Sequence, residues 1–195
     1  MSVSFRCASP KSKPEQPIIG GEESSSPTAD APDETIVIKP PRMPEGAVRA
    51  NFKAYDVPFY ASVKEVDRQR GKTVIEFEQR AIPKIVLPEK TYGATLSSLR
   101  FEEFDRDLLL VNAKLKDPVF NKYYLYILKN NQWKQVVNAF AIHRDNRPDT
   151  LQPIVVNPKN ENEMLRYYSV FDLDQTSSLG YTWRLLQESI PIENQ

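Results

Sequence analysis

The sequence predicts a mostly β protein: a single antiparallel β-sandwich or partly open barrel-like domain behind a disordered N-terminal tail. From about residue 46 onward, short stretches rich in β-branched and aromatic residues recur between turn residues, which is typical of an all-β domain. Alternating helices, which a parallel sheet needs for its crossovers, do not appear between these stretches. Residues 121–140 contain two such stretches around Asn130-Asn131, a pattern that indicates a hairpin.

Residues 1–45 differ in composition from the rest of the chain. Half of the 16 prolines lie in the first 44 residues, and Phe5 is the only aromatic residue there. So few large apolar side chains cannot offset the entropy of ordering this segment, and residues 20–26 have the composition of a flexible linker. We therefore expect a disordered Pro/Ser/Glu-rich tail or tether, in which Thr35–Lys39 is the one candidate for a short edge strand.

Cys7 lies near the start of this tail and is followed by the Ser/Pro/Glu-rich linker. This arrangement resembles the mature N-terminus of a bacterial lipoprotein, which implies a lipid anchor on Cys7 and a location in the cell envelope. The preceding Ser4-Phe5-Arg6 departs from the Leu-small-small pattern of such sites. The alternative interpretation is an incidental free thiol in a cytoplasmic protein.

The β-rich domain, residues 46–195, begins with three stretches that favour strands. Residues 51–67 mix aromatic and aliphatic side chains and are broken by Pro58, which predicts two short strands with a bend and places the proline at a sheet edge or a bulge. Residues 73–78 alternate in polarity, with the odd-numbered side chains predicted to face inward. Residues 84–87 are a short apolar run between two prolines.

The next region contains one segment of ambiguous secondary structure and one clear strand. Residues 96–107 space their apolar side chains at both two and three, so they fit either a helix or a strand that leads into an acidic turn. In residues 109–115, apolar side chains occupy every odd-numbered position, and two of the three even-numbered positions are polar. This alternation predicts a strand. Asp117-Pro118 then starts the link to the hairpin.

The hairpin pairs residues 122–128 with residues 132–140. Its strands are rich in tyrosine and branched aliphatic residues, and asparagine tolerates the positive φ that a two-residue turn requires. The turn fixes the register. The predicted pairs are Leu128–Trp133, Ile127–Lys134, Tyr126–Gln135, Leu125–Val136 and Tyr124–Val137. Both faces carry apolar side chains, so we expect this hairpin at the centre of the sheet.

The sequence predicts three strands and their connecting loops in the last third of the chain. Residues 143–150 are polar and predict a loop that holds His143 at the surface. Residues 160–164 suit a helical turn. The strands are predicted at residues 151–156, 166–173 and 181–192, the last two joined by residues 174–180.

Charge and composition exclude several functional classes. Lysine plus arginine equals aspartate plus glutamate, so no net field favours nucleic acid. No apolar run approaches the roughly 18 residues that a membrane span needs. One cysteine and one histidine leave no disulfide framework and no His-rich zinc site. No Gly-rich phosphate loop or nucleophile elbow occurs, so we predict no cofactor and no catalytic residue.

Residues 170–176, VFDLDQT, form an apolar strand that ends in Asp-x-Asp-x-Thr. This pattern resembles the first motif of haloacid dehalogenase-type phosphatases. The resemblance implies that Asp172 is a nucleophile and Asp174 a general acid in a metal-dependent hydrolase. Gln175 departs from the glycine that is commonest in the motif, and only about twenty residues follow, too few for the family's later motifs. The motif also lacks its usual α/β context.

The same residues fit a second chemistry, because Asp172, Asp174 and Thr176 place oxygen atoms at alternate positions. Hard cations such as Ca²⁺ take six to eight oxygen ligands. The glycine and the closing acidic residue of a complete calcium loop are missing at the expected offsets. The sequence thus offers a weak metal site or an ordinary acidic turn.

Aromatic and arginine side chains provide the remaining candidates. Trp133, Tyr126, Trp183 and Arg184 are the ligand-surface candidates, since aromatic rings and guanidinium groups combine in binding surfaces. Tyr181 would belong to the same surface as Trp183. We therefore expect a non-catalytic binding or structural module for an unknown protein or small ligand, with a membrane tether through its N-terminus. The hydrolase at Asp172 and Asp174 is the alternative.

Overall fold

Antiparallel strands make up nearly all of the regular structure in the computed structural model, which describes residues 42–54, 57–79, 82–88 and 90–192. These residues belong to one compact unit. The strands are β1 (Val48–Ala50), β2 (Phe59–Asp67), β3 (Lys72–Phe77), β4 (Ile85–Val86), β5 (Thr91–Leu99), β6 (Leu108–Leu115), β7 (Phe120–Lys129), β8 (Gln132–His143), β9 (Ile154–Asn157), β10 (Asn160–Leu173) and β11 (Tyr181–Pro191). A short 3-10 helix, η1 (Arg144–Asn146), follows β8.

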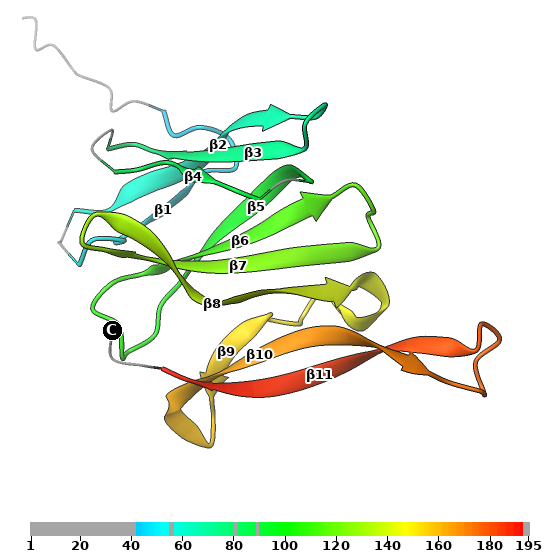
Figure 1. Cartoon of the computed structure of the whole chain (residues 1–195). Helices are drawn as coiled ribbons and strands as arrows, with labels where there is room; N and C mark the ends of the chain where they lie inside the picture. The colour runs from blue at the N-terminus through cyan, green and yellow to red at the C-terminus, as the bar shows by residue number, and fades with distance from the viewer. Residues whose placement is uncertain (1–41, 55–56, 80–81, 89, 193–195) are drawn as a thin grey trace, which may run out of the picture. The chain divides into compact units, whose positions relative to one another are not determined.

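The strands form three antiparallel sheets, and Figure 1 shows them as three layers. Sheet A has the order β1-β2-β3-β4, sheet B the order β5-β6-β7-β8, and sheet C the order β11-β10-β9. All three sheets are built from strands that follow one another in the chain, so each strand pairs antiparallel with the strand before or after it. Sheet B is the middle layer, and each of its faces meets another sheet.

Two hydrophobic cores result from this arrangement, one on each face of sheet B. On β6, Leu109 and Val111 face sheet A, while Leu108 and Leu110 face sheet C. Successive strand residues point to opposite faces, so a strand between two layers must be apolar at nearly every position. The burial of each such leucine contributes about 1.5–3 kcal/mol.

The β7–β8 turn follows the prediction. Asn130 and Asn131 have φ values of 50° and 58°, which is the left-handed conformation that a two-residue I′ turn requires. The predicted pairs Leu128–Trp133, Ile127–Lys134 and Tyr126–Gln135 are confirmed. Strand β7 lies inside sheet B as expected, but β8 is an edge strand, so the prediction of a central hairpin is wrong for β8. Residues 123–128 of β7 are buried on both faces because other sheets lie over them, whereas the first half of β8 is largely exposed.

The predicted pairs Leu125–Val136 and Tyr124–Val137 are wrong. Leu125 lies opposite Val137, because two β-bulges interrupt the register of β8 beyond Gln135. Each bulge adds a residue to β8 and shifts the side chains that follow it. The free carbonyl of Asn138 accepts a hydrogen bond from Arg166 Nη1 of β10 at 3.1 Å. Sheet C thus stabilises the irregular part of β8.

Other expectations have mixed outcomes. Residues 96–107 are the end of β5 followed by turns, which is the strand alternative. The predicted helical turn at residues 160–164 is wrong: these residues begin β10, where β9 and β11 provide the hydrogen-bond partners that a local pattern cannot reveal. Cys7 and Thr35–Lys39 lie outside the described residues, as does all but the end of the predicted tail.

The predicted fold class is confirmed: the described residues are mostly β, all strand pairs are antiparallel, and none of the sheets closes into a barrel. The structure has one layer more than the predicted sandwich, because sheet C covers the face of sheet B that does not meet sheet A. In the described part of the chain, none of the helical structure has the length and hydropathy of a membrane span.

Candidate functional site

The hairpin of β10 and β11 extends beyond the strand that supports it. The two strands pair from Glu163 opposite Pro191 to Leu173 opposite Tyr181. Strand β9 pairs with β10 only up to Arg166, so residues 167–173 and 181–187 form a two-stranded ribbon with the turn 174–180 at its tip. Figure 1 shows this ribbon reaching past the ends of the strands of sheet B.

One face of the ribbon is aromatic and exposed. Phe171 lies opposite Trp183 and Leu173 opposite Tyr181, and paired residues of an antiparallel ladder share a face. Phe171 is 54% exposed, Leu173 78% and Tyr181 37%, and Leu179 in the turn is 69% exposed. We call Phe171, Leu173, Tyr181 and Trp183, together with Leu179 of the adjoining turn, the aromatic face.

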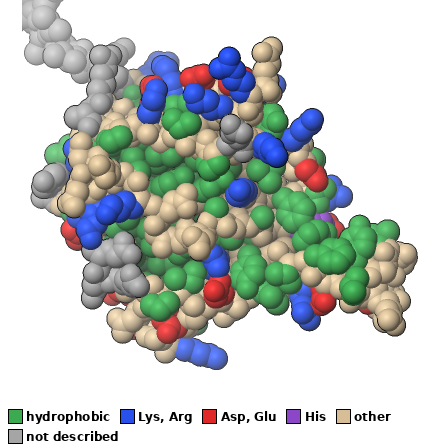
Figure 2. Space-filling view, in the orientation of Figure 1, with side chains coloured by type: hydrophobic (Ala, Val, Ile, Leu, Met, Phe, Trp, Pro, Cys, Tyr) green, Lys and Arg blue, Asp and Glu red, His purple; other side chains and the backbone are tan. Residues whose placement is uncertain are grey.

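The aromatic face concentrates exposed apolar surface in one place. Four of the eight large hydrophobic side chains that are exposed in the described residues belong to it; the others are Met43, Val57, Val66 and Val86. Figure 2 shows hydrophobic side chains gathered on the projecting side of the molecule. A contiguous exposed patch of this kind marks an interaction surface, whereas single exposed apolar residues are ordinary.

Ring contacts connect the aromatic face to sheet B. The Phe171 ring stacks on Tyr181 with centroids 5.2 Å apart and meets the edge of Trp183 at 5.6 Å. Trp183 in turn contacts Phe120 at 4.8 Å and stacks on His143 at 5.6 Å. Each such pair contributes about 0.5–1.5 kcal/mol beyond its burial. These contacts connect Phe171, Tyr181 and Trp183 to the end of sheet B.

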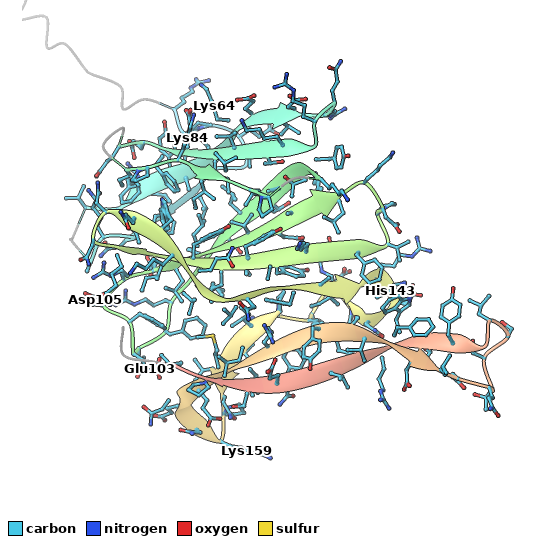
Figure 3. The ribbon with its side chains drawn as sticks, viewed as in Figure 1. Lys64, Lys84, Glu103, Asp105, His143 and Lys159 are labelled. Atoms are coloured by element: carbon cyan, nitrogen blue, oxygen red, sulfur yellow. The ribbon has the colours of Figure 1, made fainter. Side chains whose placement is uncertain are left out.

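Hydrogen bonds fasten the base of the ribbon to the end of β8. Asn146 Nδ2 donates to the carbonyl of Trp183 at 2.6 Å and to Ser169 Oγ at 3.1 Å. The backbone N–H of His143 also donates to Ser169 Oγ, at 2.8 Å. His143 is the last residue of β8 and is buried. The prediction of a surface His143 is therefore wrong, because Trp183 and Phe120 cover its ring; Figure 3 labels His143 at the base of the ribbon.

The predicted metal residues Asp172, Asp174 and Thr176 lie at the distal end of the ribbon. Asp172 forms an ion pair with Arg184, Oδ2 to Nη2, at 3.1 Å. Asp174 Oδ1 accepts hydrogen bonds from the hydroxyl of Thr176 at 2.6 Å and from its backbone N–H at 2.9 Å. These bonds hold the pKa of Asp174 below its ordinary value of 3.8. In the described residues, no three His, Cys, Asp or Glu side chains are grouped to hold a metal ion.

The predicted ligand-surface residues fall into two separate groups. Trp183 and Arg184 lie on the ribbon, whereas Tyr126 and Trp133 belong to the core between sheets A and B. The Trp133 ring stacks on Phe77 at 4.7 Å. Tyr126 and Trp133 also line a pocket of about 370 Å³ beside β4.

Phe171, Leu173 and Leu179 are candidate functional residues that the sequence analysis did not select, whereas Tyr181 was grouped with Trp183. A signal for two of them was present, because Phe171 and Leu173 precede the turn and Tyr181 and Trp183 follow it, each pair with a spacing of two. That spacing places all four side chains on one face of a hairpin. The sequence cannot show that no other layer covers this face.

Comparison of the chain with known proteins found no family model, no curated protein and no solved structure that matches it. Its function is therefore inferred from the geometry of the hairpin.

Proposed function

We propose that this chain is a non-catalytic binding module that holds another macromolecule against the aromatic face of its β10–β11 ribbon. The observation that carries the proposal is the concentration of exposed apolar side chains on this one face. Their exposure costs free energy in the isolated chain, at about 25 cal/mol per Å² of apolar surface. A partner that covers the face recovers that free energy.

The form of the site favours a macromolecule over a small ligand. Small ligands bind in concave sites that enclose most of their surface. The ribbon instead projects from the body of the domain (Figure 1) and offers its rings along one side. Its tip carries Asp172, Asp174 and a run of polar residues from Gln175 to Ser178, which would be costly to bury in lipid. The aromatic face therefore suits a protein surface that lies along the ribbon.

We also propose that the protein acts at the cell envelope. Cys7 and the linker that follows it support a lipid tether at the cell envelope, and such a linker would let the domain reach partners near the membrane. Membrane fractionation of cells that make the full-length gene product tests this part. The wild type should sediment with membranes, and Cys7→Ser should release it. A wild-type protein that stays in the soluble fraction would remove the tether and leave the binding proposal in place.

The binding proposal is tested by a photo-reactive amino acid placed at Leu173 in cells that make the chain. A matched probe at Val57, which is similarly exposed away from the ribbon, serves as the control. We expect one discrete cross-linked product from position 173, none from position 57, and loss of the product when Phe171→Ser is added. Identical products from both positions, or none from either, would contradict the proposal.

A further inference from the structure

We propose that the pocket between β4 and the start of the β7–β8 hairpin binds a small molecule that joins an aromatic ring to a carboxylate. This space of about 370 Å³, which we call the β4 pocket, lies between two edges of the molecule. Its lining includes Lys84, Ile85 and Val86 from the edge of sheet A, and Tyr126, Gln132 and Trp133 from the hairpin. None of these residues belongs to the aromatic face, so the site is separate from the proposed function.

The short length of β4 leaves this space open. β4 contains two residues, whereas β7 and β8 contain 10 and 12. Pro83 and Pro88 flank β4, and proline has no N–H with which to continue a ladder. The edge of sheet A therefore stops early beside the hairpin. The volume lies within the range of about 300–1,000 Å³ that is typical of small-molecule sites.

The inner walls of the β4 pocket are apolar and are held by packing. The Trp133 ring stacks on Phe77 at 4.7 Å and meets the edge of Phe52 at 5.7 Å. Ile85 and Tyr126 are only 5% and 6% exposed. Burial raises the pKa of the Tyr126 hydroxyl above its ordinary value of 10.0, so this side chain stays neutral at physiological pH. Rings held in this way offer a preformed surface to a flat apolar group.

The polar groups of the β4 pocket favour an anion. Lys84 is the one charged side chain among the described residues that line it, and its ammonium has no ion-pair partner in the described part of the chain. The Nε1–H of Trp133 is buried and finds no hydrogen-bond acceptor among the described residues, which costs free energy until an acceptor is supplied. The exposed Gln132 amide is a further donor. A carboxylate accepts hydrogen bonds from all three kinds of donor.

A neighbouring hollow is less suited to the same ligand. It has a volume of about 470 Å³ and shares Pro83 and Lys84 with the β4 pocket, but Glu76 also lines it. The negative charge of Glu76 would oppose a carboxylate there, as like charges do in any complex. An anion that pairs with Lys84 is therefore favoured in the space lined by Tyr126 and Trp133.

The first test follows the indole N–H signals of the full chain by NMR while benzoate is added. The chain has two tryptophans, so Trp183 on the ribbon provides an internal control, and the signal lost in Trp183→Phe identifies it. We expect the Trp133 signal to move and to saturate at millimolar benzoate, while the Trp183 signal stays in place. No saturable change at Trp133, or equal movement of both signals, would overturn the β4 pocket as a binding site.

The second test asks whether Lys84 recognises the carboxylate. Benzamide has the same ring without the charge and should bind about fivefold more weakly than benzoate, the largest effect of one exposed ion pair. Lys84→Gln should weaken benzoate binding by a similar factor and remove the preference for benzoate. The matched control is Lys64→Gln, which changes another exposed lysine of sheet A and should leave both dissociation constants unchanged. Figure 3 labels both lysines.

The outcomes are distinct from those of the proposed function. Saturation at Trp133, together with loss of the benzoate preference in Lys84→Gln alone, supports an aromatic carboxylate as the ligand. Equal affinity of the wild type for benzamide and benzoate, or a preference that survives in Lys84→Gln, overturns the recognition of the anion. The photo-reactive probe at Leu173 tests the ribbon independently, so failure of the β4 pocket leaves the binding function of the aromatic face in place.

Discussion

The two long hairpins of this protein use similar residues in opposite ways. In the β7–β8 hairpin, Tyr124 and Tyr126 stack with centroids 6.2 Å apart, and both are buried. In the β10–β11 hairpin, Phe171 and Tyr181 stack at 5.2 Å, and both are exposed. Both pairs are stacked, the first within one strand and the second across two strands. What differs is whether another layer lies over the rings.

The difference follows from the lengths of the layers. Sheet B lies between sheets A and C, so β7 contributes side chains to both cores. Sheet C extends farther than sheet B on one side (Figure 1), and its long hairpin continues where the middle layer has ended. Stability is therefore concentrated in one hairpin, while the surface available for binding is concentrated in the other.

The largest expected contrast is between two leucines, one in each hairpin. Leu125 of β7 is fully buried, whereas Leu173 of β10 is the most exposed of the large apolar residues described. Leu125→Ala should lower the free energy of unfolding by about 2–5 kcal/mol because it leaves a cavity. Leu173→Ala should change it by no more than about 0.5 kcal/mol, as surface substitutions do.

Urea unfolding at low protein concentration measures both variants, since dilution removes any contribution of self-association. A loss for Leu173→Ala as large as that for Leu125→Ala would contradict the contrast. It would mean that the ribbon is part of a core in solution.

A smaller effect is expected where the two hairpins meet. Asn146→Ala removes the hydrogen bonds to the Trp183 carbonyl and to Ser169 Oγ. At about 0.5–1.5 kcal/mol for each of the two bonds, the variant should be destabilised by about 1–3 kcal/mol. Amide hydrogen exchange should become faster in residues 167–187 and stay unchanged in β7. Faster exchange throughout the domain would show that the ribbon does not open independently.

The two ends of the β10–β11 hairpin offer a finer comparison through their carboxylates. Hydrogen bonds from Thr176 at the tip hold the pKa of Asp174 below 3.8. At the base, bonds from Ser189 and Asn157 lower the pKa of Glu163 from 4.5. A lowered pKa in the folded state means that each carboxylate stabilises the fold above its ordinary pKa, and that this contribution is lost as the pH falls through the folded value.

Carboxyl-carbon NMR titrations test each end separately. Thr176→Val should raise the pKa of Asp174 toward 3.8 and leave Glu163 unchanged. Ser189→Ala should raise the pKa of Glu163 toward 4.5 and leave Asp174 unchanged. A shift of both carboxyl groups in either variant would show that tip and base titrate as one unit.

The smallest expected effect concerns metal. Millimolar Ca²⁺ or Mg²⁺ should leave the thermal midpoint unchanged in the wild type, in Asp172→Asn and in Asp174→Asn, because Arg184 and Thr176 already engage these carboxylates. Phosphatase assays of the same proteins should show no activity that depends on either aspartate. A midpoint raised by metal only in the wild type would support the hydrolase at the ribbon tip.

Sequence reasoning was accurate where local chemistry decides the outcome. Positive φ at Asn130 and Asn131 fixes the turn and, through it, the first three pairs of the β7–β8 ladder. The bulges beyond Gln135 were not predictable, because an added residue changes neither the composition nor the apolar character of the strand. Thr91–Thr95, the first part of β5, was missed because Gly93 interrupts it, although threonine and tyrosine at the other positions favour a strand.

The candidate site was predictable only in part. The strands of the ribbon and the turn between them were expected. The sequence alone could therefore have predicted that Phe171, Leu173, Tyr181 and Trp183 share a face. Its exposure was not, because the same alternation describes a strand with one buried face. Whether that face meets a partner layer depends on where sheet B ends, which is a property of the tertiary fold.

The hydrogen bond from Asn146 to the Trp183 carbonyl has a consequence for solubility. β11 is an edge strand, and edge strands with free backbone groups can template the addition of further chains into fibrils. The amide of Asn146 occupies one outward carbonyl at the middle of the most aromatic segment, and Pro191 at the far end of the strand has no N–H to donate. These two positions interrupt the row of backbone groups with which a further chain could pair, while the rings beside it stay accessible.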